Sequence, residues 1–185
     1  MVGVLVGSNR NETIDRAAEI ETFAGWWFDN AHWPSITMSS AIAWLRERTP
    51  SIGDMKSIIH NDMIFHNILA DETGITAILD WEQASIGHPG EDLGYAYPTV
   101  SRLAGWERFL NSYYQAGGPH IRVEDLDFFI VRAQVRLMGL VLISGRHVFE
   151  QGGKQPIIMA SAGAHFTQRL MHRIAMVLDD ILSRS

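Results

Sequence analysis

The segment from Ile58 to Glu82 constrains the fold of this 185-residue chain more than any other stretch of its sequence. Two apolar runs, Asn67 to Ala70 and Ile75 to Asp80, flank the polar sequence Asp71-Glu72-Thr73-Gly74. The glycine of this polar sequence can take the positive φ that a short turn needs. The pattern therefore predicts a β-hairpin, which would bring the polar residues at the ends of its two strands close together.

These polar residues are His60, Asp62, Asn67 and Asp80. Asp follows His by two residues, Asn follows five residues later, and the second Asp closes the next strand, which is the order of a kinase catalytic loop and its metal-binding aspartate. Phosphoryl transfer needs a carboxylate near the attacking hydroxyl and oxygen ligands for Mg²⁺. The spacing favours Asp62 as the catalytic carboxylate and Asn67 and Asp80 as the metal ligands.

In these residues and their spacing, the chain resembles the aminoglycoside phosphotransferase and choline kinase-like family of small-molecule phosphotransferases. The resemblance includes Asp80-Trp81-Glu82 and the later Gly87-His88-Pro89-Gly90-Glu91-Asp92-Leu93. It implies a protein-kinase-like C-terminal lobe over residues 13–185, mainly α-helical with a small β-hairpin. It also implies ATP and Mg²⁺ as cofactors, a small-molecule hydroxyl as substrate, and supporting roles for His60, which braces the loop, and Asp92, which holds its backbone.

The sequence departs from the family pattern inside the loop. Asn61 stands where the family usually has glycine, and asparagine is the non-glycine residue that best tolerates positive φ. The departures at Ile64 and His66 affect contacts with the acceptor. The alternative hypothesis is that this region forms a metal-dependent hydrolase site. Its residues would be His60, Asp62, His66 and Asp80.

Apolar residues at helical spacing predict helices through most of the remaining chain. The expected helices run from about Thr13 to Asp29, Ser39 to Arg48, Glu91 to Ala96 and onward, Gly105 to Ala116, Val123 to Glu150 and Ile157 to Leu182. Asn11 or Thr13 is expected to cap the first helix. The helix at 123–150 should be the buried central one, because it is apolar on most of its circumference. The last helix should bury one stripe, made of Phe166, Leu170, Ile174, Val177 and Ile181.

Composition narrows the classes of function. The chain has no cysteine, which excludes disulfides and thiolate metal sites and is typical of a cytoplasmic protein. Its net charge of −6 argues against a nucleic-acid partner and favours cationic acceptors. Arg132, Gln134 and Arg136 interrupt the apolar run of the longest helix before it reaches the ~20 residues that cross a bilayer, so no membrane partner is expected.

Residues 1–12 are expected to be an N-terminal extension or a strand remnant, because they are too few for the β-rich lobe with which members of this family normally begin. Two classes of function follow from the absence of that N-terminal lobe. The chain is either one lobe of an ATP-dependent kinase, whose other lobe is expected to come from a separate chain or to be lost by truncation of the gene model, or a non-catalytic binding or interaction module that kept the fold. In both cases apolar residues near the hairpin, with Ile64, Phe65 and Ile68 as candidates, should favour a partner chain or self-association.

Overall fold

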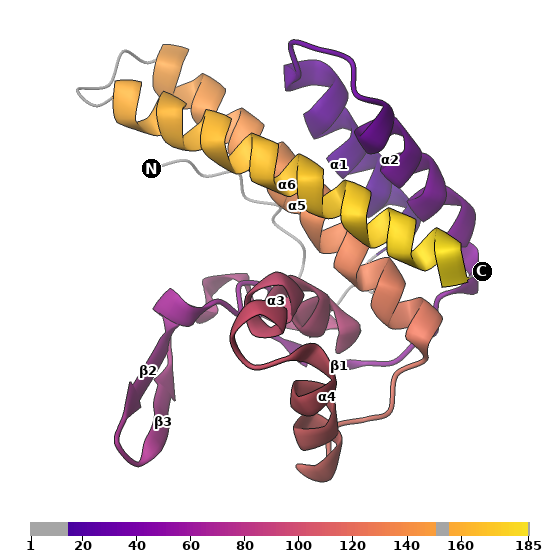
Figure 1. The fold of residues 1–185 in the computed structure, drawn as a ribbon, viewed down its shortest axis with the longest axis vertical. Helices are drawn as coiled ribbons and strands as arrows, with labels where there is room; N and C mark the ends of the chain where they lie inside the picture. The colour runs from indigo at the N-terminus through magenta and orange to yellow at the C-terminus, as the bar shows by residue number, and fades with distance from the viewer. Residues whose placement is uncertain (1–14, 151–155, 185) are drawn as a thin grey trace.

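Two long helices, α5 (Val123–Glu150) and α6 (Pro156–Arg184), lie side by side at the centre of the fold (Figure 1). The structure is a computed structural model that describes residues 15–150 and 156–184. Helix α5 packs against α1, α2, α3 and α6, and it is therefore the buried central helix that the sequence predicted, with the same bounds. None of the described helices is long and apolar enough to cross a membrane.

Helices α1 (Arg16–Asn30) and α2 (Ile36–Arg48) pack against α5, and α2 also packs against α6 (Figure 1). The side chains that these four helices bury form one apolar core, because each helix turns an apolar stripe inward. Full burial of one large apolar side chain contributes about 1.5–3 kcal/mol. The largest of these side chains are Trp27, Phe128, Phe129, Ile20, Met38, Ile42, Leu45, Met138 and Ile174.

Both N-terminal helices begin at a polar cap, although not where the sequence predicted. The Asp15 carboxylate accepts hydrogen bonds from the N–H groups of Ala17 and Ala18 at 3.0 and 3.2 Å, so α1 begins at the next residue, Arg16. The predicted caps Asn11 and Thr13 lie outside the described residues.

Helix α2 begins three residues earlier than predicted. The Ser35 hydroxyl accepts a hydrogen bond from the Met38 N–H at 3.2 Å and caps the helix, so Ser39, the predicted start, already lies inside the first turn. The sequence pattern missed this start because Ile36, the first helical residue, is 87% exposed and does not belong to the apolar stripe.

The buried stripe of α6 differs from the predicted one at one end. Leu170, Ile174 and Ile181 are buried as expected and Val177 is half-buried, whereas Phe166 is 51% exposed. The next residue, Thr167, takes the buried position, because it lies three residues before Leu170 on the face that packs against α2 and α5.

Helix α3 (Gly90–Leu103) begins one residue before the predicted start at Glu91 and continues through Pro98. It packs closely on α5 at Gly94, where a Cβ atom would lie 2.4 Å from the carbonyl carbon of Phe129. Only glycine allows the two backbones to approach this far. Helix α4 (Trp106–Gln115) follows and buries Leu110 in a second, smaller apolar cluster with residues of α3 and α5.

The strands form two separate antiparallel pairs. Strand β2 (Ile68–Asp71) pairs with β3 (Gly74–Ile78), which confirms the predicted hairpin. This hairpin projects away from the helices (Figure 1). Strand β1 (Ser57–Ile59) pairs with β4 (Ser85–Gly87), a pairing that the sequence did not predict because each strand has only three residues. The prediction that the second hairpin strand reaches Asp80 is wrong, since the φ of Asp80 is 65° and ends the extended backbone earlier.

Three short 3₁₀ helices lie in the connections, at Thr49–Ser51 (η1), Phe65–Asn67 (η2) and Trp81–Gln83 (η3). Two of them flank the hairpin, so the candidate site residues lie on short irregular segments at its base rather than within strands. Of the three apolar residues expected to be exposed here, Phe65 is 49% exposed, whereas Ile64 and Ile68 are half-buried.

Candidate active site

Asp62 and Asn67 lie in direct contact at the base of the hairpin. The Asn67 side-chain nitrogen donates hydrogen bonds to the backbone oxygen of Asp62 at 2.9 Å and to its Oδ2 at 3.0 Å. Asn67 is buried, so these two bonds fix the orientation of its amide. The amide nitrogen is committed to Asp62, which leaves the Asn67 oxygen to face other ligands.

A residue that the sequence did not single out, Tyr95 on α3, holds the other side of this carboxylate. The Tyr95 hydroxyl donates a hydrogen bond to Asp62 Oδ1 at 2.7 Å. Burial, followed by this hydrogen bond, raises the pKa of the Tyr95 phenol, which therefore remains a donor. Tyr95 lies one helical turn after Asp92. This spacing was the only feature of the sequence that could have pointed to Tyr95 as a site residue.

The backbone between β1 and Asp62 is held by Asp92. The Asp92 carboxylate accepts hydrogen bonds from the N–H groups of His60, at 2.7 Å, and Asn61, at 2.8 Å. Asn61 has a φ of 66°, as predicted for the family's glycine position, and its side-chain nitrogen donates to the Ser85 hydroxyl at 2.9 Å. These bonds offset the cost of the left-handed backbone, about 1–2 kcal/mol.

Arg136 of α5 also contacts this loop and was not predicted. Its guanidinium donates hydrogen bonds to the backbone oxygen of Asn61 at 3.0 Å and to Gln83 Oε1 at 2.6 Å, and it lies 5.9 Å from the ring centroid of Tyr95. Burial, and then the charge of Arg132, lowers the pKa of Arg136. Arg136 thus ties the central helix to both sides of the hairpin base.

His60 links the loop to the segment that carries Asp80. Its Nε2 lies 2.7 Å from the backbone oxygen of Leu79 and donates to it, while its Nδ1 accepts the N–H of Asp62 at 3.2 Å. The ring is buried and packs on Trp81 at a centroid distance of 4.7 Å. Because both ring nitrogens are engaged, the geometry suits a brace better than a proton carrier.

Asp80 lies beside Asn67 without a direct contact between their side chains. The backbone N–H of Leu79 donates to the backbone oxygen of Asn67 at 2.8 Å, which places Asp80 one residue from this bond. Asp80 is exposed. The Asn67 amide oxygen and the Asp80 carboxylate are hard oxygen donors, the ligand type that Mg²⁺ binds, so the residues present fit this ion.

The predicted alternative, a metal-dependent hydrolase site, finds no support. Among the described residues, no group of three or more His, Asp or Glu side chains is arranged to hold a metal ion. Both ring nitrogens of His60 are engaged in hydrogen bonds, and His66 is exposed.

Comparison with known proteins decides the family. The model of the phosphotransferase enzyme family matches residues 9–128, and this range contains every candidate residue named above except Arg136. The chain belongs to the phosphotransferase enzyme family. This result confirms the resemblance inferred from the sequence.

Solved structures show the fold of this phosphotransferase domain. Choline kinase LicA from Streptococcus pneumoniae matches with a TM-score of 0.62 and 18% identity over 90% of this chain and 57% of its own. A thermostable mutant of aminoglycoside phosphotransferase APH(4)-Ia, in ternary complex with AMP-PNP and hygromycin B, matches with a TM-score of 0.57 and 16% identity over 84% of this chain and 50% of its own. The predicted kinase-like fold is therefore confirmed.

Curated relatives are much longer than the phosphotransferase domain. Acyl-CoA dehydrogenase family member 11 of Gallus gallus is 26% identical over an alignment of 132 residues that covers 60% of this chain and 17% of that protein. The uncharacterized protein YcbJ of Bacillus subtilis (strain 168) is 30% identical over 99 residues, which are 53% of this chain and 26% of that protein. The chain thus spans about a quarter or less of the length of these two relatives.

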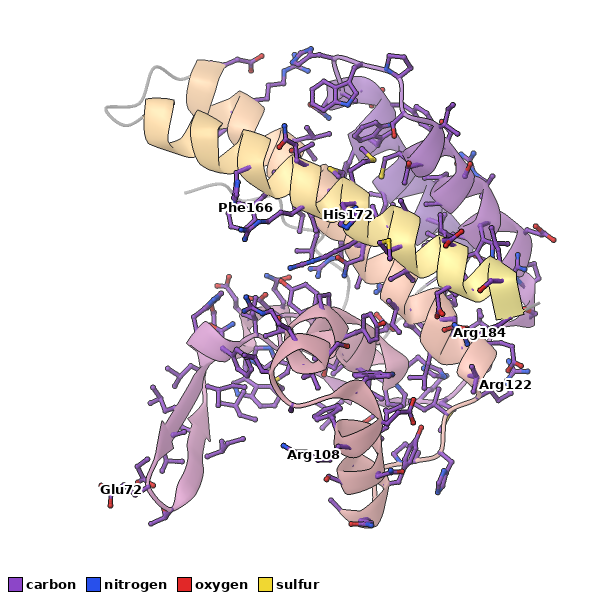
Figure 2. The ribbon with its side chains drawn as sticks, in the orientation of Figure 1. Glu72, Arg108, Arg122, Phe166, His172 and Arg184 are labelled. Carbon is purple, nitrogen blue, oxygen red and sulfur yellow. The ribbon has the colours of Figure 1, made fainter. Side chains whose placement is uncertain are left out.

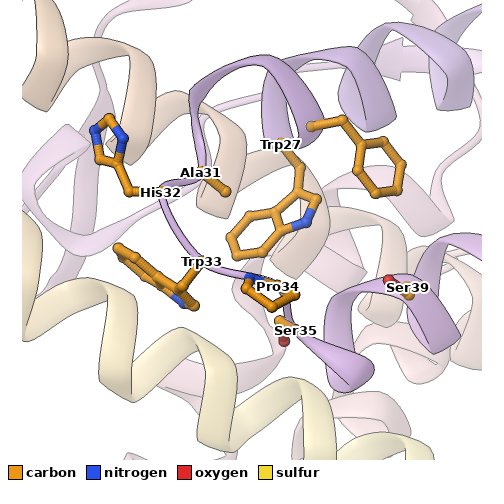
Figure 3. Close-up of a pocket in the computed structure, with 8 residues that line it drawn as sticks. Trp27, Ala31, His32, Trp33, Pro34, Ser35 and Ser39 are labelled. Carbon is orange, nitrogen blue, oxygen red and sulfur yellow. The ribbon is translucent and has the colours of Figure 1, made fainter.

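A pocket of about 330 Å³ lies at the turn between α1 and α2, apart from the candidate site (Figure 3). Four of its lining residues, Trp27, Phe28, His32 and Trp33, carry aromatic rings. Its lining residues are Trp27, Phe28, Ala31, His32, Trp33, Pro34, Ser35 and Ser39. None of the candidate catalytic residues belongs to it, so this pocket does not locate the chemistry.

His88, at the start of α3, is buried in neutral form next to the site. Its Nδ1 accepts the Gly90 N–H at 3.0 Å, its backbone N–H donates to Glu91 Oε1 at 3.0 Å, and its ring stacks on Phe129 at 4.5 Å. Its Nε2 has no hydrogen-bond partner in the described part of the chain. Burial is the main cause that lowers the pKa of His88, from 6.5 to about 4.

This shift predicts a pH dependence of stability. Because the pKa of His88 is lower in the folded state, burial of the neutral ring contributes fully to the free energy of unfolding above pH 6.5. This contribution is lost as the pH falls toward 4. The expected loss approaches about 3 kcal/mol across this window. Urea unfolding of the wild type and of His88→Asn, whose amide oxygen can still accept the Gly90 N–H, measures it.

The difference between these two proteins isolates the histidine, because burial raises the pKa of Glu91 and gives an opposite slope in both of them. His88→Asn should lose less stability than the wild type between pH 6.5 and 4. Parallel pH profiles for the two proteins would show that His88 is not buried in its neutral form.

Proposed function

We propose that this domain transfers the γ-phosphoryl group of ATP to a hydroxyl group of a small molecule, with Asp62 as the catalytic residue that orients the hydroxyl. One observation carries the proposal. The Asp62 carboxylate is held from both sides by side-chain donors, Asn67 and Tyr95, on a loop whose backbone Asp92 fixes. Such a preorganised carboxylate is the main protein group that phosphoryl transfer needs beside the acceptor.

Asp62 keeps the capacity to bind an acceptor. A carboxylate has about four lone-pair sites, and the donors Asn67 and Tyr95 use two of them. An acceptor hydroxyl can therefore donate to Asp62 without displacing either neighbour. The hydrogen bond directs the hydroxyl oxygen toward the phosphoryl group and gives its proton a place to go as the new P–O bond forms.

The proposed metal ligands are Asn67, through its amide oxygen, and Asp80. Mg²⁺ bound there would neutralise charge on the phosphates of ATP. The chain's own contribution is to hold these two oxygens in place, since the Asn67 nitrogen bonds to Asp62 and His60 bonds to the residue before Asp80. His60 and Asp92 are supporting residues in this proposal.

The relatives support the nucleotide and the class of acceptor. The structure of APH(4)-Ia holds AMP-PNP together with hygromycin B, and LicA is a choline kinase. We extend to this domain ATP as donor and a small-molecule hydroxyl as acceptor. The absence of cysteine fits a cytoplasmic site of action.

The partner proposal concerns the apolar surface around the hairpin. Several large apolar side chains of β1, β2, β3, β4 and η2 are between 48% and 74% exposed, and they are Ile58, Phe65, Leu69, Ile75 and Ile86. Large exposed apolar patches usually mark contact surfaces. We propose that the β-rich lobe of a two-lobed kinase, or a second copy of the chain, packs here.

Phosphorus NMR tests the proposed reaction. Incubation with ATP, Mg²⁺ and a panel of alcohols, amino sugars and sugar phosphates is expected to give a new phosphate ester signal together with ADP. A matched incubation without acceptor controls for hydrolysis. Nucleotide binding without transfer to any acceptor would contradict the proposed enzyme activity and would favour a non-catalytic binding module.

A further inference from the structure

Arg136 on α5 is a half-buried arginine without an acidic partner. In the described part of the chain, no carboxylate forms an ion pair with it. Arg132, one turn earlier on the same helix, lies between the carboxylates of Glu91 and Glu19. Partial burial, and then the positive charge of Arg132, lowers the pKa of Arg136, so its charge destabilises the folded chain. Groups whose charge is disfavoured in this way occur most often at functional sites.

Three contacts place Arg136 next to the loop that carries Asp62. Its guanidinium donates a hydrogen bond to the backbone oxygen of Asn61, at 3.0 Å, and Asn61 immediately precedes Asp62. The guanidinium carbon lies 5.9 Å from the ring centroid of Tyr95, whose hydroxyl donates to Asp62 Oδ1 at 2.7 Å. A third contact, to Gln83 Oε1 at 2.6 Å, fixes another nitrogen of the guanidinium. Arg136 therefore supports both the backbone and the carboxylate of Asp62, each through one intermediate residue.

Building on the proposed function, we propose that Arg136 is a positioning residue for phosphoryl transfer and acts on the reaction through Asp62. The planar fork of its guanidinium holds the oxygens of Asn61 and Gln83 at a fixed separation. The positive charge attracts the face of the Tyr95 ring and so keeps its hydroxyl directed toward the carboxylate. Phosphoryl transfer depends on such positioning, since a misplacement of about 1 Å can lower the rate on the order of 10²-fold.

Arg136→Met tests the proposal, because methionine is long and flexible but carries no charge and no donor. The kcat is measured with ATP, Mg²⁺ and the panel acceptor that gives the phosphate ester signal, and it should fall by about 10²-fold while KM for ATP stays nearly unchanged. Arg136→Lys keeps the charge without the fork and should recover roughly tenfold of this loss. The control is Arg108→Met, which changes an exposed arginine of α4 that lies away from α6 (Figure 2) and should leave kcat within about twofold.

A double-mutant cycle tests whether Arg136 acts through Asp62. In the Asp62→Asn background the carboxylate to be positioned is gone, so Arg136→Met should lower the rate by less than about threefold. The same loss of about 10²-fold in both backgrounds would show that Arg136 acts elsewhere and would overturn the proposal. Tyr95→Phe should lower kcat roughly tenfold by removing one hydrogen bond to the carboxylate, whereas Tyr97→Phe, the same change on the same helix, should not.

Urea unfolding separates positioning from a purely structural role. Arg136→Met removes a charge that the fold disfavours, so the unfolding midpoint should lie at or above that of the wild type. Gln83 is exposed, and water can replace the guanidinium there. If Arg136→Met loses stability together with activity, and Arg136→Lys is no more active than Arg136→Met, the residue is structural and the proposal is wrong.

Failure of this proposal differs from failure of the proposed function. If the wild type forms no ester with any acceptor, both are wrong. If the wild type forms the ester and Arg136→Met forms it equally fast, only the assignment of Arg136 is wrong. Calorimetric titration with Mg²⁺ and a non-hydrolysable ATP analogue should give the same affinity for Arg136→Met and the wild type. Loss of this binding would place the effect of Arg136 on the nucleotide and would also overturn the assignment.

Discussion

Replacing Asp62 with asparagine is expected to lower the rate of phosphoryl transfer by about 10²–10⁴-fold, the usual contribution of a positioned acid or base. Asparagine has nearly the same shape, so it removes the charge and the proton acceptor, while its one remaining oxygen can still accept from Tyr95 or from Asn67, although not in both of the positions that the two carboxylate oxygens occupy. The substitution should lower kcat, because the proposed role of Asp62 is at the transition state rather than in nucleotide binding.

The matched control is Asp54→Asn, which changes an exposed aspartate in the loop before β1. It should leave the rate within about twofold of the wild type, since exposed substitutions away from special contacts have small effects. Equal rates for Asp62→Asn and the wild type, with the same ester formed, would remove Asp62 from the mechanism.

The largest expected effect on stability comes from Arg132→Leu, which should lower the free energy of unfolding by about 3–5 kcal/mol. Arg132 on α5 is only 5% exposed, and its guanidinium bridges Glu91 of α3, at 2.8 Å, and Glu19 of α1, at 2.8 Å. Without the arginine, Glu91 remains buried without a positive partner, and burial already raises its pKa. Urea unfolding monitored by circular dichroism measures the loss.

Arg46→Leu is the control for this effect, because Arg46 pairs with Glu21 in the same two-oxygen geometry on the surface. Solvent screens this pair, so its loss should change stability little. If Arg132→Leu and Arg46→Leu destabilise the protein by similar amounts, burial does not determine how much the Glu19–Arg132–Glu91 network contributes to stability.

Local patterns were sufficient to predict the hairpin and the central helix, because turn residues and apolar periodicity encode them over a few neighbouring positions. The positive φ of Asn61 followed instead from the family resemblance, in which this position is usually glycine. Contacts between distant parts of the chain were not predictable in this way. Tyr95 reaches Asp62 across 33 residues, and Arg136 reaches Asn61 across 75. No local rule connects a tyrosine or an arginine on one helix to a loop so far away in the sequence.

The remaining errors have similar physical causes. The second hairpin strand ends before Asp80 because the backbone of Asp80 is left-handed. Aspartate adopts this conformation less readily than glycine, so the sequence did not predict it. Phe166 was assigned to the buried stripe because it lies four residues before Leu170, but the register of α6 gives the buried position to Thr167, three residues before Leu170. The three-residue strands β1 and β4 are too short for a pattern.

Calorimetric titration with Mg²⁺ and a non-hydrolysable ATP analogue tests the proposed site most directly, because it needs no knowledge of the acceptor. The proposal predicts Mg²⁺-dependent binding that Asp80→Ala removes more completely than Asp62→Ala, since Asp80 is a proposed metal ligand and Asp62 faces the acceptor. Equal binding by the wild type and Asp80→Ala, with both proteins folded, would contradict the assignment of this site to a magnesium-dependent phosphotransferase.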